Sequence, residues 1–231
     1  MRVLALIPAR AGSTRVPGKN LAVLEGRTLV RRALETALDA GCFAEVVLSS
    51  DADEILAQAD GLPVRAVRRP AALATATARA FDAVVHALGE VDPRHELDAV
   101  AVVQCTSPFT APEDLAGAVA LLETTGADSV VSVVRLDAAL HPLKLKVLEG
   151  DRLLPFLEDD RLTPSHELPP LWARNGSVYV SRRAVVDGGA LVGEDVRGYE
   201  MPAERSFDID TPRDLEFARF LVEQGAGAAG S

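Results

Sequence analysis

The sequence predicts an α/β fold with a mostly parallel central sheet and helices on both of its faces. Short apolar runs typical of buried strands alternate with amphipathic segments typical of helices. The first pair is a strand over residues 2–8 and a helix over 28–40, which ends just before Gly41. With 231 residues, 48% of them hydrophobic, the chain can bury one good core. We therefore expect a single domain over 1–224 and a flexible tail over 225–231.

The alternation of strands and helices continues as far as residue 136. Pro112 fits the first turn of one predicted helix and Gly126 fits its end. Asp51 is expected to cap the helix that begins at residue 52. The strands are predicted over 44–50, 63–67, 97–104 and 128–136, and the helices over 52–59, 79–91 and 111–126.

The pattern breaks from about Leu140 to Trp172, where several prolines surround an alternating segment over 143–156. This composition predicts an inserted arm with a β-hairpin, used as a subunit contact or a lid more often than as a separate domain. The chain then returns to strands over 175–181 and 207–211 and to a last helix over 212–224. Thr211 and Asp214 have the spacing of a capping box at the start of that helix.

Composition narrows the classes of function. The formal net charge of −10 repels nucleic acid and anionic lipid, so we expect neither as a partner. No apolar run approaches the roughly 18 residues that span a bilayer. Cys42 and Cys105 lack metal-ligand spacing and lie in apolar surroundings, and the four histidines show no metal spacing either. These features predict a protein of the reducing cytoplasm.

The segment IPARAGSTRVPGKN, residues 7–20, directly follows the first predicted strand and carries two arginines and a lysine. It fails the dinucleotide-binding fingerprint, because Gly12 and Gly18 are six positions apart without a third glycine. It also departs from a P-loop, because five residues separate the glycines and Asn20 follows the lysine. A surface loop with solvated charges is one interpretation. The position after a strand favours the other, a triphosphate-binding loop that uses the backbone from Ala11 to Ser13 with Arg10, Arg15 and Lys19.

Six motifs occur in order along nearly the whole chain: IPARAGSTRVPGKN, SSD, RRPAALA, QCTSPF, NGSVYV and FDIDTPRDL. Together they resemble the motifs of the acylneuraminate cytidylyltransferases, the CMP-sialic acid synthetases. The resemblance implies a Rossmann-like nucleotidyltransferase fold and a homodimer that exchanges the arm. It also implies the reaction, in which the anomeric hydroxyl of a 2-keto sugar acid attacks the α-phosphate of CTP in the presence of Mg²⁺.

Asp208 and Asp210 lie two positions apart in FDIDT, so both carboxylates share one face if the segment is extended. Two carboxylates on one face suit Mg²⁺, which takes one or two of them with phosphate oxygens and water. A turn that merely leads into the last helix is the alternative, and the resemblance favours the metal. Gln104 ends a predicted strand, where its amide could read a cytosine edge.

The resemblance assigns roles to individual positions. The catalytic set is Arg10, Lys19, Asp208 and Asp210, of which the two aspartates bind the metal. The nucleotide-binding set is Ala9, Arg10, Ala11, Gly12, Ser13, Arg15, Lys19, Asn20, Arg69 and Gln104. The acceptor-binding set is Gln104, Thr106, Ser107, Lys144 and Asn175. Each position outside the opening loop also has a plain structural interpretation as a turn, a solvated charge or a packed side chain, and Cys105 is expected to be only a packed thiol.

Two positions depart from the family pattern. Residues 75–77 follow LA, where members usually carry an acidic residue. Ser165 and His166 stand where the sialic acid enzymes typically have an arginine and a glutamine, the arginine being thought to hold the acceptor carboxylate. Either Arg161, Arg174 or another cation replaces it, or the acceptor differs. The alternatives are therefore a cytidylyltransferase for Kdo or for a non-sugar acid such as a phosphonate, and a non-catalytic nucleotide-binding module.

Overall fold

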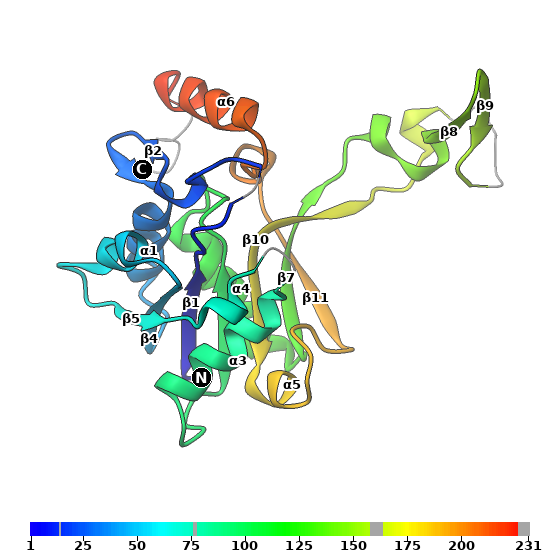
Figure 1. Ribbon diagram of the computed structural model, residues 1–231. Coiled ribbons are helices and arrows are strands. Elements are labelled where there is room, and N and C mark those ends of the chain that lie inside the picture. Colours follow the sequence, from blue (N-terminus) through cyan, green and yellow to red (C-terminus); the bar gives the residue numbers. More distant parts are fainter. Residues whose placement is uncertain (14, 76–77, 158–163, 226–231) are drawn as a thin grey trace.

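The computed structural model describes residues 1–13, 15–75, 78–157 and 164–225. In this part of the chain, seven strands form one sheet in the order β11-β7-β10-β6-β1-β4-β5 (Figure 1). All of its strands run parallel except β10, which is antiparallel to both of its neighbours. The predicted mostly parallel sheet is confirmed. The strands are β1 (Val3–Pro8), β4 (Glu45–Ser50), β5 (Arg65–Arg68), β6 (Ala99–Val103), β7 (Ser129–Arg135), β10 (Trp172–Arg182) and β11 (Val196–Glu200).

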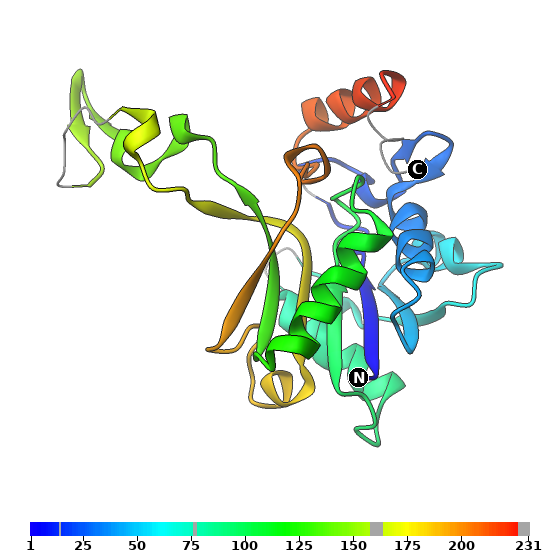
Figure 2. The same cartoon turned by 180° about the vertical axis from the view of Figure 1, so that it is seen from behind.

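Helices cover both faces of this sheet, as predicted (Figure 2). Apolar side chains of α1, α2 and α4 pack on one face, and those of α3 and α5 pack on the other. The central strands β1 and β6 are buried along almost their whole length, which explains why their sequences are uninterrupted apolar runs. The helices are α1 (Leu29–Asp39), α2 (Asp53–Leu56), α3 (Ala80–Val91), α4 (Pro112–Thr125), α5 (Arg183–Asp187) and α6 (Pro212–Glu223). Among the helices of the described residues, none is long and apolar enough to cross a membrane.

Local sequence explains most helix ends. Gly126 closes α4 with a φ of 70°, a left-handed conformation that glycine adopts without strain. Thr211 and Asp214 form the predicted capping box of α6. The prediction for Asp51 is wrong, because α2 has Ala52 at its N-cap without a side-chain hydrogen bond. The Asp51 carboxylate instead accepts a hydrogen bond at 2.9 Å from the N–H of Ala11, which lies in the loop after the neighbouring strand β1.

Further elements differ from the sequence prediction, which also did not include α5. The segment over 207–211 is not a strand, because its backbone bonds to a loop and to α6 in place of a sheet neighbour. Strand β11 was not predicted, since its mixed polar pattern gives no alternation signal. The small hairpin of β2 (Val23–Leu24) and β3 (Arg27–Thr28) was also missed, although Glu25 and Gly26 form its turn with positive φ angles of 52° and 74°.

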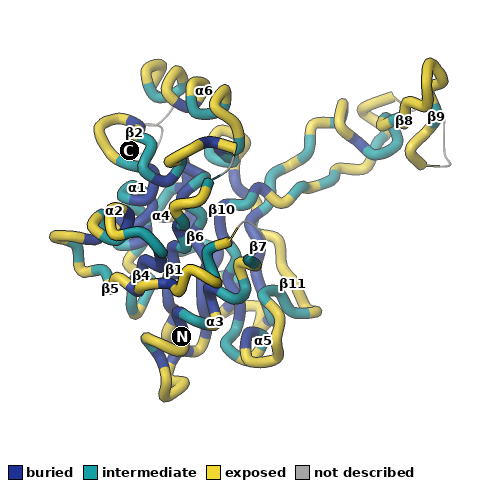
Figure 3. The backbone as a smooth tube through the Cα atoms, in the orientation of Figure 1, coloured by how far each residue is buried: buried dark blue, intermediate teal, exposed yellow. Residues whose placement is uncertain are grey.

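The predicted arm leaves the sheet at the ends of β7 and β10 and projects away from the body (Figure 1). Its hairpin consists of β8 (Lys146–Glu149) and β9 (Arg152–Pro155), joined by a turn at Gly150. Much of the arm is exposed, including large apolar side chains (Figure 3). Residues 158–163 of the arm and residues 226–231 of the predicted tail lie outside the described part of the chain.

Candidate active site

A cavity of about 390 Å³ lies where β1 and β6 end, at the carboxyl edge of the sheet. Ligands of open α/β sheets bind at this edge, because the loops that follow parallel strands converge there. The opening loop forms one side of the cavity and the segment before α6 forms another. Eight of the predicted site residues line it, namely Arg10, Ser13, Arg15, Lys19, Asn20, Gln104, Thr106 and Asp210.

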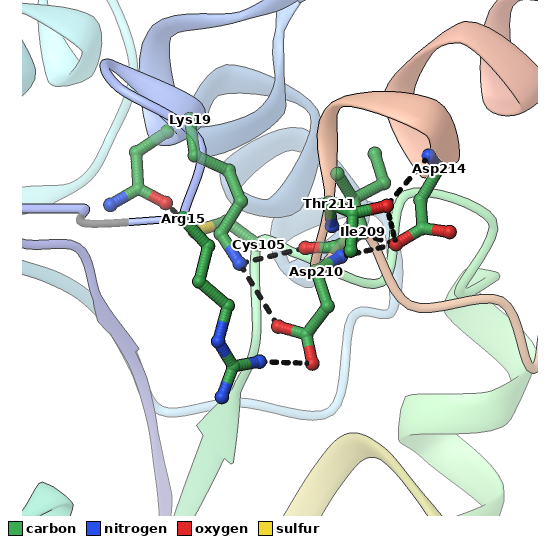
Figure 4. Close-up of polar contacts among 8 residues, drawn as sticks. Arg15, Lys19, Cys105, Ile209, Asp210, Thr211 and Asp214 are labelled. Carbon is green, nitrogen blue, oxygen red and sulfur yellow. Dashed lines mark hydrogen bonds and ion pairs between the residues drawn. The ribbon is translucent and has the colours of Figure 1, made fainter.

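Two cations of the opening loop meet the Asp210 carboxylate (Figure 4). Arg15 Nη1 lies 2.8 Å from Asp210 Oδ2, and Lys19 Nζ lies 3.5 Å from Asp210 Oδ1. Lys19 Nζ also donates to the Ile209 carbonyl oxygen at 2.7 Å. The Lys19 side chain is only 14% exposed, whereas Asp210 is half exposed toward solvent. The two ends of the sequence therefore share one polar wall of the cavity.

Buried contacts hold the opening loop in this position. Asn20 donates from Nδ2 to the Arg10 carbonyl oxygen at 2.8 Å, and its Oδ1 accepts from Cys105 Sγ at 3.1 Å. Gly18 has a φ of 65°, which lets the chain turn before Lys19. Burial raises the pKa of the Cys105 thiol to about 12, so this thiol stays protonated and can donate. The prediction that Cys105 is only a packed thiol missed this anchoring bond.

The backbone of the loop is less available to an anion than the sequence suggests. The N–H of Ala9 donates to the Ser49 carbonyl, that of Ala11 to Asp51, and that of Ser13 to the Ala11 carbonyl, each at 2.9 Å. In this conformation an anion in the cavity would be bound mainly by side chains. Arg10 lines the cavity while its guanidinium hydrogen-bonds to the Thr75 carbonyl.

Arg69 lies behind the cavity wall and does not line the cavity itself. Arg69 is 6% exposed. Its guanidinium donates to Ser49 Oγ at 3.2 Å and to the Ser49 carbonyl oxygen at 2.9 Å. Burial lowers the pKa of Arg69, nearby Asp51 raises it, and nearby Arg10 lowers it further. The structure thus brings Arg69 close to the loop, and its contact with a nucleotide stays a prediction.

Asp208 does not line the cavity, although the charges of Asp210 and Lys19 act on its carboxyl. Burial raises its pKa, a hydrogen bond from the Thr106 side chain lowers it, and the neighbouring charge of Asp210 raises it. Its Oδ1 is buried without a hydrogen-bond partner among the described residues. A buried, unpaired carboxylate oxygen is costly unless a ligand or cation reaches it. Together with Asp210 it fits Mg²⁺, which needs few carboxylates when phosphate oxygens complete its shell.

The remaining predicted acceptor residues do not line the cavity. Ser107 is buried behind Gln104, with its Oγ unpartnered among the described residues. Lys144 lies on the arm, where its Nζ donates to Ser165 Oγ. Asn175 is buried, and both ends of its amide are engaged by other protein groups. A contact between Asn175 and an acceptor therefore stays a prediction that this arrangement does not favour.

The fold and the cavity define an α/β protein that can bind an anionic ligand at the carboxyl edge of its sheet. The chain belongs to the cytidylyltransferase family, whose sequence model matches residues 4–228. Membership makes it a nucleotidyltransferase, and it confirms the enzyme class that the six motifs predict. The non-catalytic alternative loses its support.

Named relatives agree with this assignment. The CMP-N,N'-diacetyllegionaminic acid synthase of Legionella pneumophila is 34% identical, over 96% of this chain and 97% of that protein. The N-acylneuraminate cytidylyltransferase A of Danio rerio is 33% identical, over 95% of this chain and 50% of that protein. The resemblance to the acylneuraminate group is thus confirmed.

Solved structures show the same fold. A CMP:2-keto-3-deoxy-manno-octonic acid synthetase complexed with CTP has a TM-score of 0.75, with 22% identity over 97% of this chain and 100% of that one. A 4-diphosphocytidyl-2C-methyl-D-erythritol synthase from Anaerococcus prevotii has a TM-score of 0.65, with 17% identity over 96% of this chain and 98% of that one. These likenesses confirm the predicted Rossmann-like nucleotidyltransferase fold.

Proposed function

We propose that this protein couples CTP to a 2-keto sugar acid, giving the CMP-sugar and pyrophosphate. The observation that carries the proposal is the meeting of Arg15 and Lys19 with Asp210 across one cavity. The names of its relatives support the substrate class, because they concern legionaminic, acylneuraminic and pseudaminic acids and Kdo. Arg10, Arg15 and Lys19 supply the positive charge that a triphosphate needs in a chain of net charge −10.

In the proposed reaction, the anomeric hydroxyl oxygen of the acceptor forms a bond to the α-phosphorus of CTP. The bond from that phosphorus to the oxygen bridging to the β-phosphate breaks, and pyrophosphate leaves with the electron pair. The hydroxyl proton is released to solvent. Phosphoryl-type transfer depends mainly on positioning and on neutralising charge, so no nucleophilic side chain is needed. Lys19 and Arg15 would stabilise the charge that develops on the leaving pyrophosphate.

Mg²⁺ is the proposed cofactor. It would be held by Asp208, whose Oδ1 lacks a partner among the described residues, and by Asp210. The described residues contain no group of three or more His, Cys, Asp or Glu side chains that could hold a metal, so phosphate oxygens and water must supply the other ligands. When bound, Mg²⁺ neutralises phosphate charge. Arg15 and Lys19 would then exchange their contacts with Asp210 for contacts with phosphate.

The acceptor half of the site is proposed to include the arm of a second copy in a homodimer. Lys144 and Ser165 form a polar contact on the arm, which projects away from the body of its own chain (Figure 1). Exposed apolar side chains along the arm, such as Leu148 and Leu153, would be covered in such a dimer.

A cytoplasmic location is also proposed. Two free cysteines in the described residues agree with a reducing cytoplasm.

A pyrophosphate-release assay tests this function. CTP, UTP and ATP are each supplied with N-acetylneuraminic, legionaminic and pseudaminic acids, with Kdo and with a small phosphonate acid, in Mg²⁺ or in EDTA. We expect release only with CTP, with one sugar acid much preferred, and none in EDTA. Preference for the phosphonate would correct the acceptor class, whereas preference for Kdo would identify the acceptor within the proposed class. Binding of CTP without release for any acceptor would contradict the proposal.

A further inference from the structure

The two aspartates proposed to hold Mg²⁺ lie on a segment that the sheet does not support. Residues 206–210 form no strand. Among their contacts with neighbouring loops, the Ile209 N–H donates to the Thr106 carbonyl at 2.9 Å, and Lys19 Nζ donates to the Ile209 carbonyl at 2.7 Å. The Thr106 side chain also hydrogen-bonds to Asp208. Functional carboxylates must be held within about 0.5 Å of their working position. Something other than a strand ladder must therefore fix Asp208 and Asp210.

An ion pair between a partly exposed arginine and a buried carboxylate fixes the start of the segment. Arg205 donates to both carboxylate oxygens of Asp114, from Nε to Oδ2 and from Nη2 to Oδ1, each at 2.8 Å. Asp114 is fully buried in the first turn of α4, and its Oδ2 also accepts from the Ala111 N–H at 2.9 Å. A two-pronged contact of this kind restricts the guanidinium to one orientation. A single charge contact would leave several orientations open.

A second contact joins the segment to the middle of the sheet. Asn175 donates from Nδ2 to Ser206 Oγ at 2.9 Å, while its Oδ1 accepts from Ser132 Oγ at 2.6 Å. Asn175 lies in a bulge of β10 between Arg174 and Tyr179, which turns its side chain out of the regular ladder. The amide therefore bridges two strands of the sheet and the segment that leads to the aspartates.

The far end of the segment is fixed by α6. The Asp210 N–H donates to Asp214 Oδ2 at 3.0 Å, and the same oxygen accepts from the Thr211 N–H at 2.7 Å. Residues 207–210 are thus a short bridge between two anchored ends. Movement of Arg205 or Ser206 would move Asp208, because only one residue separates Ser206 from it.

We infer that Asp114, Arg205 and Asn175 are positioning residues that set the places of Asp208 and Asp210. Such an ion pair adds little net stability, because the cost of taking the Asp114 carboxylate out of water offsets its attraction to Arg205, so the two residues are better explained by geometry. The inference rests on the proposed function, because that function assigns Asp208 and Asp210 as ligands of Mg²⁺. It also explains why the predicted acceptor residue Asn175 is turned toward the protein.

Two variants and one matched control test the inference. Arg205→Lys keeps the positive charge but loses the two-pronged contact with Asp114. Ser206→Ala removes the hydroxyl that accepts from Asn175, with little risk to folding. Arg183→Lys is the control, since Arg183 pairs with Asp92, which is 5% exposed, at the opposite end of the sheet. For each protein, amide hydrogen exchange of Ile209 and Asp210 is measured without metal or nucleotide. The Mg²⁺ concentration for half-maximal turnover is measured separately.

Arg205→Lys and Ser206→Ala should speed exchange of the Ile209 and Asp210 amides by about tenfold and raise the half-maximal Mg²⁺ concentration by about tenfold. Arg183→Lys should leave both within about twofold of the wild type, whatever it does to overall stability. Unchanged exchange in both test variants overturns the inference, and so does faster exchange with unchanged Mg²⁺ dependence. If the wild type releases no pyrophosphate, the proposed function fails, and the exchange result alone decides whether these residues fix the segment.

Discussion

Lys19 Nζ and the Asp210 carboxylate lie 3.5 Å apart although 191 positions separate the two residues in the chain. Lys19 belongs to the loop after β1, and Asp210 directly precedes the cap of α6. This contact, the bond from Lys19 to Ile209 at 2.7 Å and the Arg15–Asp210 pair at 2.8 Å link the opening loop to the aspartate segment. In the proposed function, a polyphosphate would lie between the two residues, and the reaction would take place beside this contact.

The contribution of Lys19 can be measured directly. Lys19→Ala should reduce turnover by at least about 100-fold, because the largely buried ammonium would act on developing charge in a place with little water. The variant should remain folded by circular dichroism. Arg2→Ala is the control, since Arg2 forms an exposed surface pair with Glu96 and should retain near wild-type turnover. A mild effect of Lys19→Ala would remove Lys19 from the proposed machinery.

Asp208→Asn should separate activity from stability. Burial raises the pKa of Asp208, so the folded protein favours the protonated form more than the unfolded chain does. That contribution to stability is present below the unfolded pKa and is lost as the pH rises through the folded pKa. At pH 7 the Asn variant should therefore be as stable as the wild type or more stable by about 1 kcal/mol.

Turnover of Asp208→Asn should fall by at least about 100-fold, because a neutral amide replaces a proposed metal ligand. Asp210→Asn should lose turnover to the same degree. Urea unfolding at pH 5 and 8 gives the stability, and Asp39→Asn on the exposed surface of α1 is the control. A stability loss that matches the loss of activity would indicate a structural role for Asp208.

The two cysteines should differ in reactivity. Burial raises the pKa of Cys105 from 9.0 to about 12, and its thiol is fully buried, whereas Cys42 is half-buried with a smaller rise. Because the thiolate is the reactive form, a disulfide reagent at pH 8 should label Cys105 at least about 100-fold more slowly than Cys42. The Cys42→Ser variant isolates the slow reaction. Equal rates in the native protein would contradict the buried bond to Asn20.

Complementation tests the proposed role of the arm. Lys19→Ala alters the cavity and Lys144→Ala alters the arm, and each variant alone should have low activity. If each site combines the cavity of one copy with the arm of the other, co-expressed variants should recover about a quarter of wild-type turnover, because half of the dimers are mixed and each has one intact site. No recovery, with mixed dimers verified by mass spectrometry, would confine each site to one chain.

Most of the fold could be predicted because its signals are local. The buried runs of β1 and β6, the proline and glycine at the ends of α4 and the Thr211 cap of α6 each act within a few residues. Two of the errors fall where contacts between distant parts of the chain override local preference. Asp51 is of a residue type that often caps helices, but its carboxylate accepts a hydrogen bond from the Ala11 N–H. FDIDT alternates as a strand would, but its backbone pairs with no strand of the sheet.

The site residues also differ in whether a local signal or a distant partner decides their role. The gathering of Arg10, Arg15 and Lys19 at one cavity could be predicted, because three cations after a first strand are a dense local signal, and their binding of an anion stays a prediction. The roles of Cys105 and Arg205 could not, because each depends on a partner far away in the chain, at Asn20 and at Asp114. Nothing in the spacing of these residues distinguishes an anchoring side chain from a merely packed one.

By itself, the sequence determined the α/β alternation, the charged opening loop and the six motifs that mark a cytidylyltransferase. Periodicity, caps and turns act over short distances and leave a readable trace. Only the tertiary structure decided that Lys19 meets Asp210 and that Asn175 faces Ser206. The reason is that side chains far apart in the chain come within hydrogen-bonding distance only once the sheet has ordered its strands.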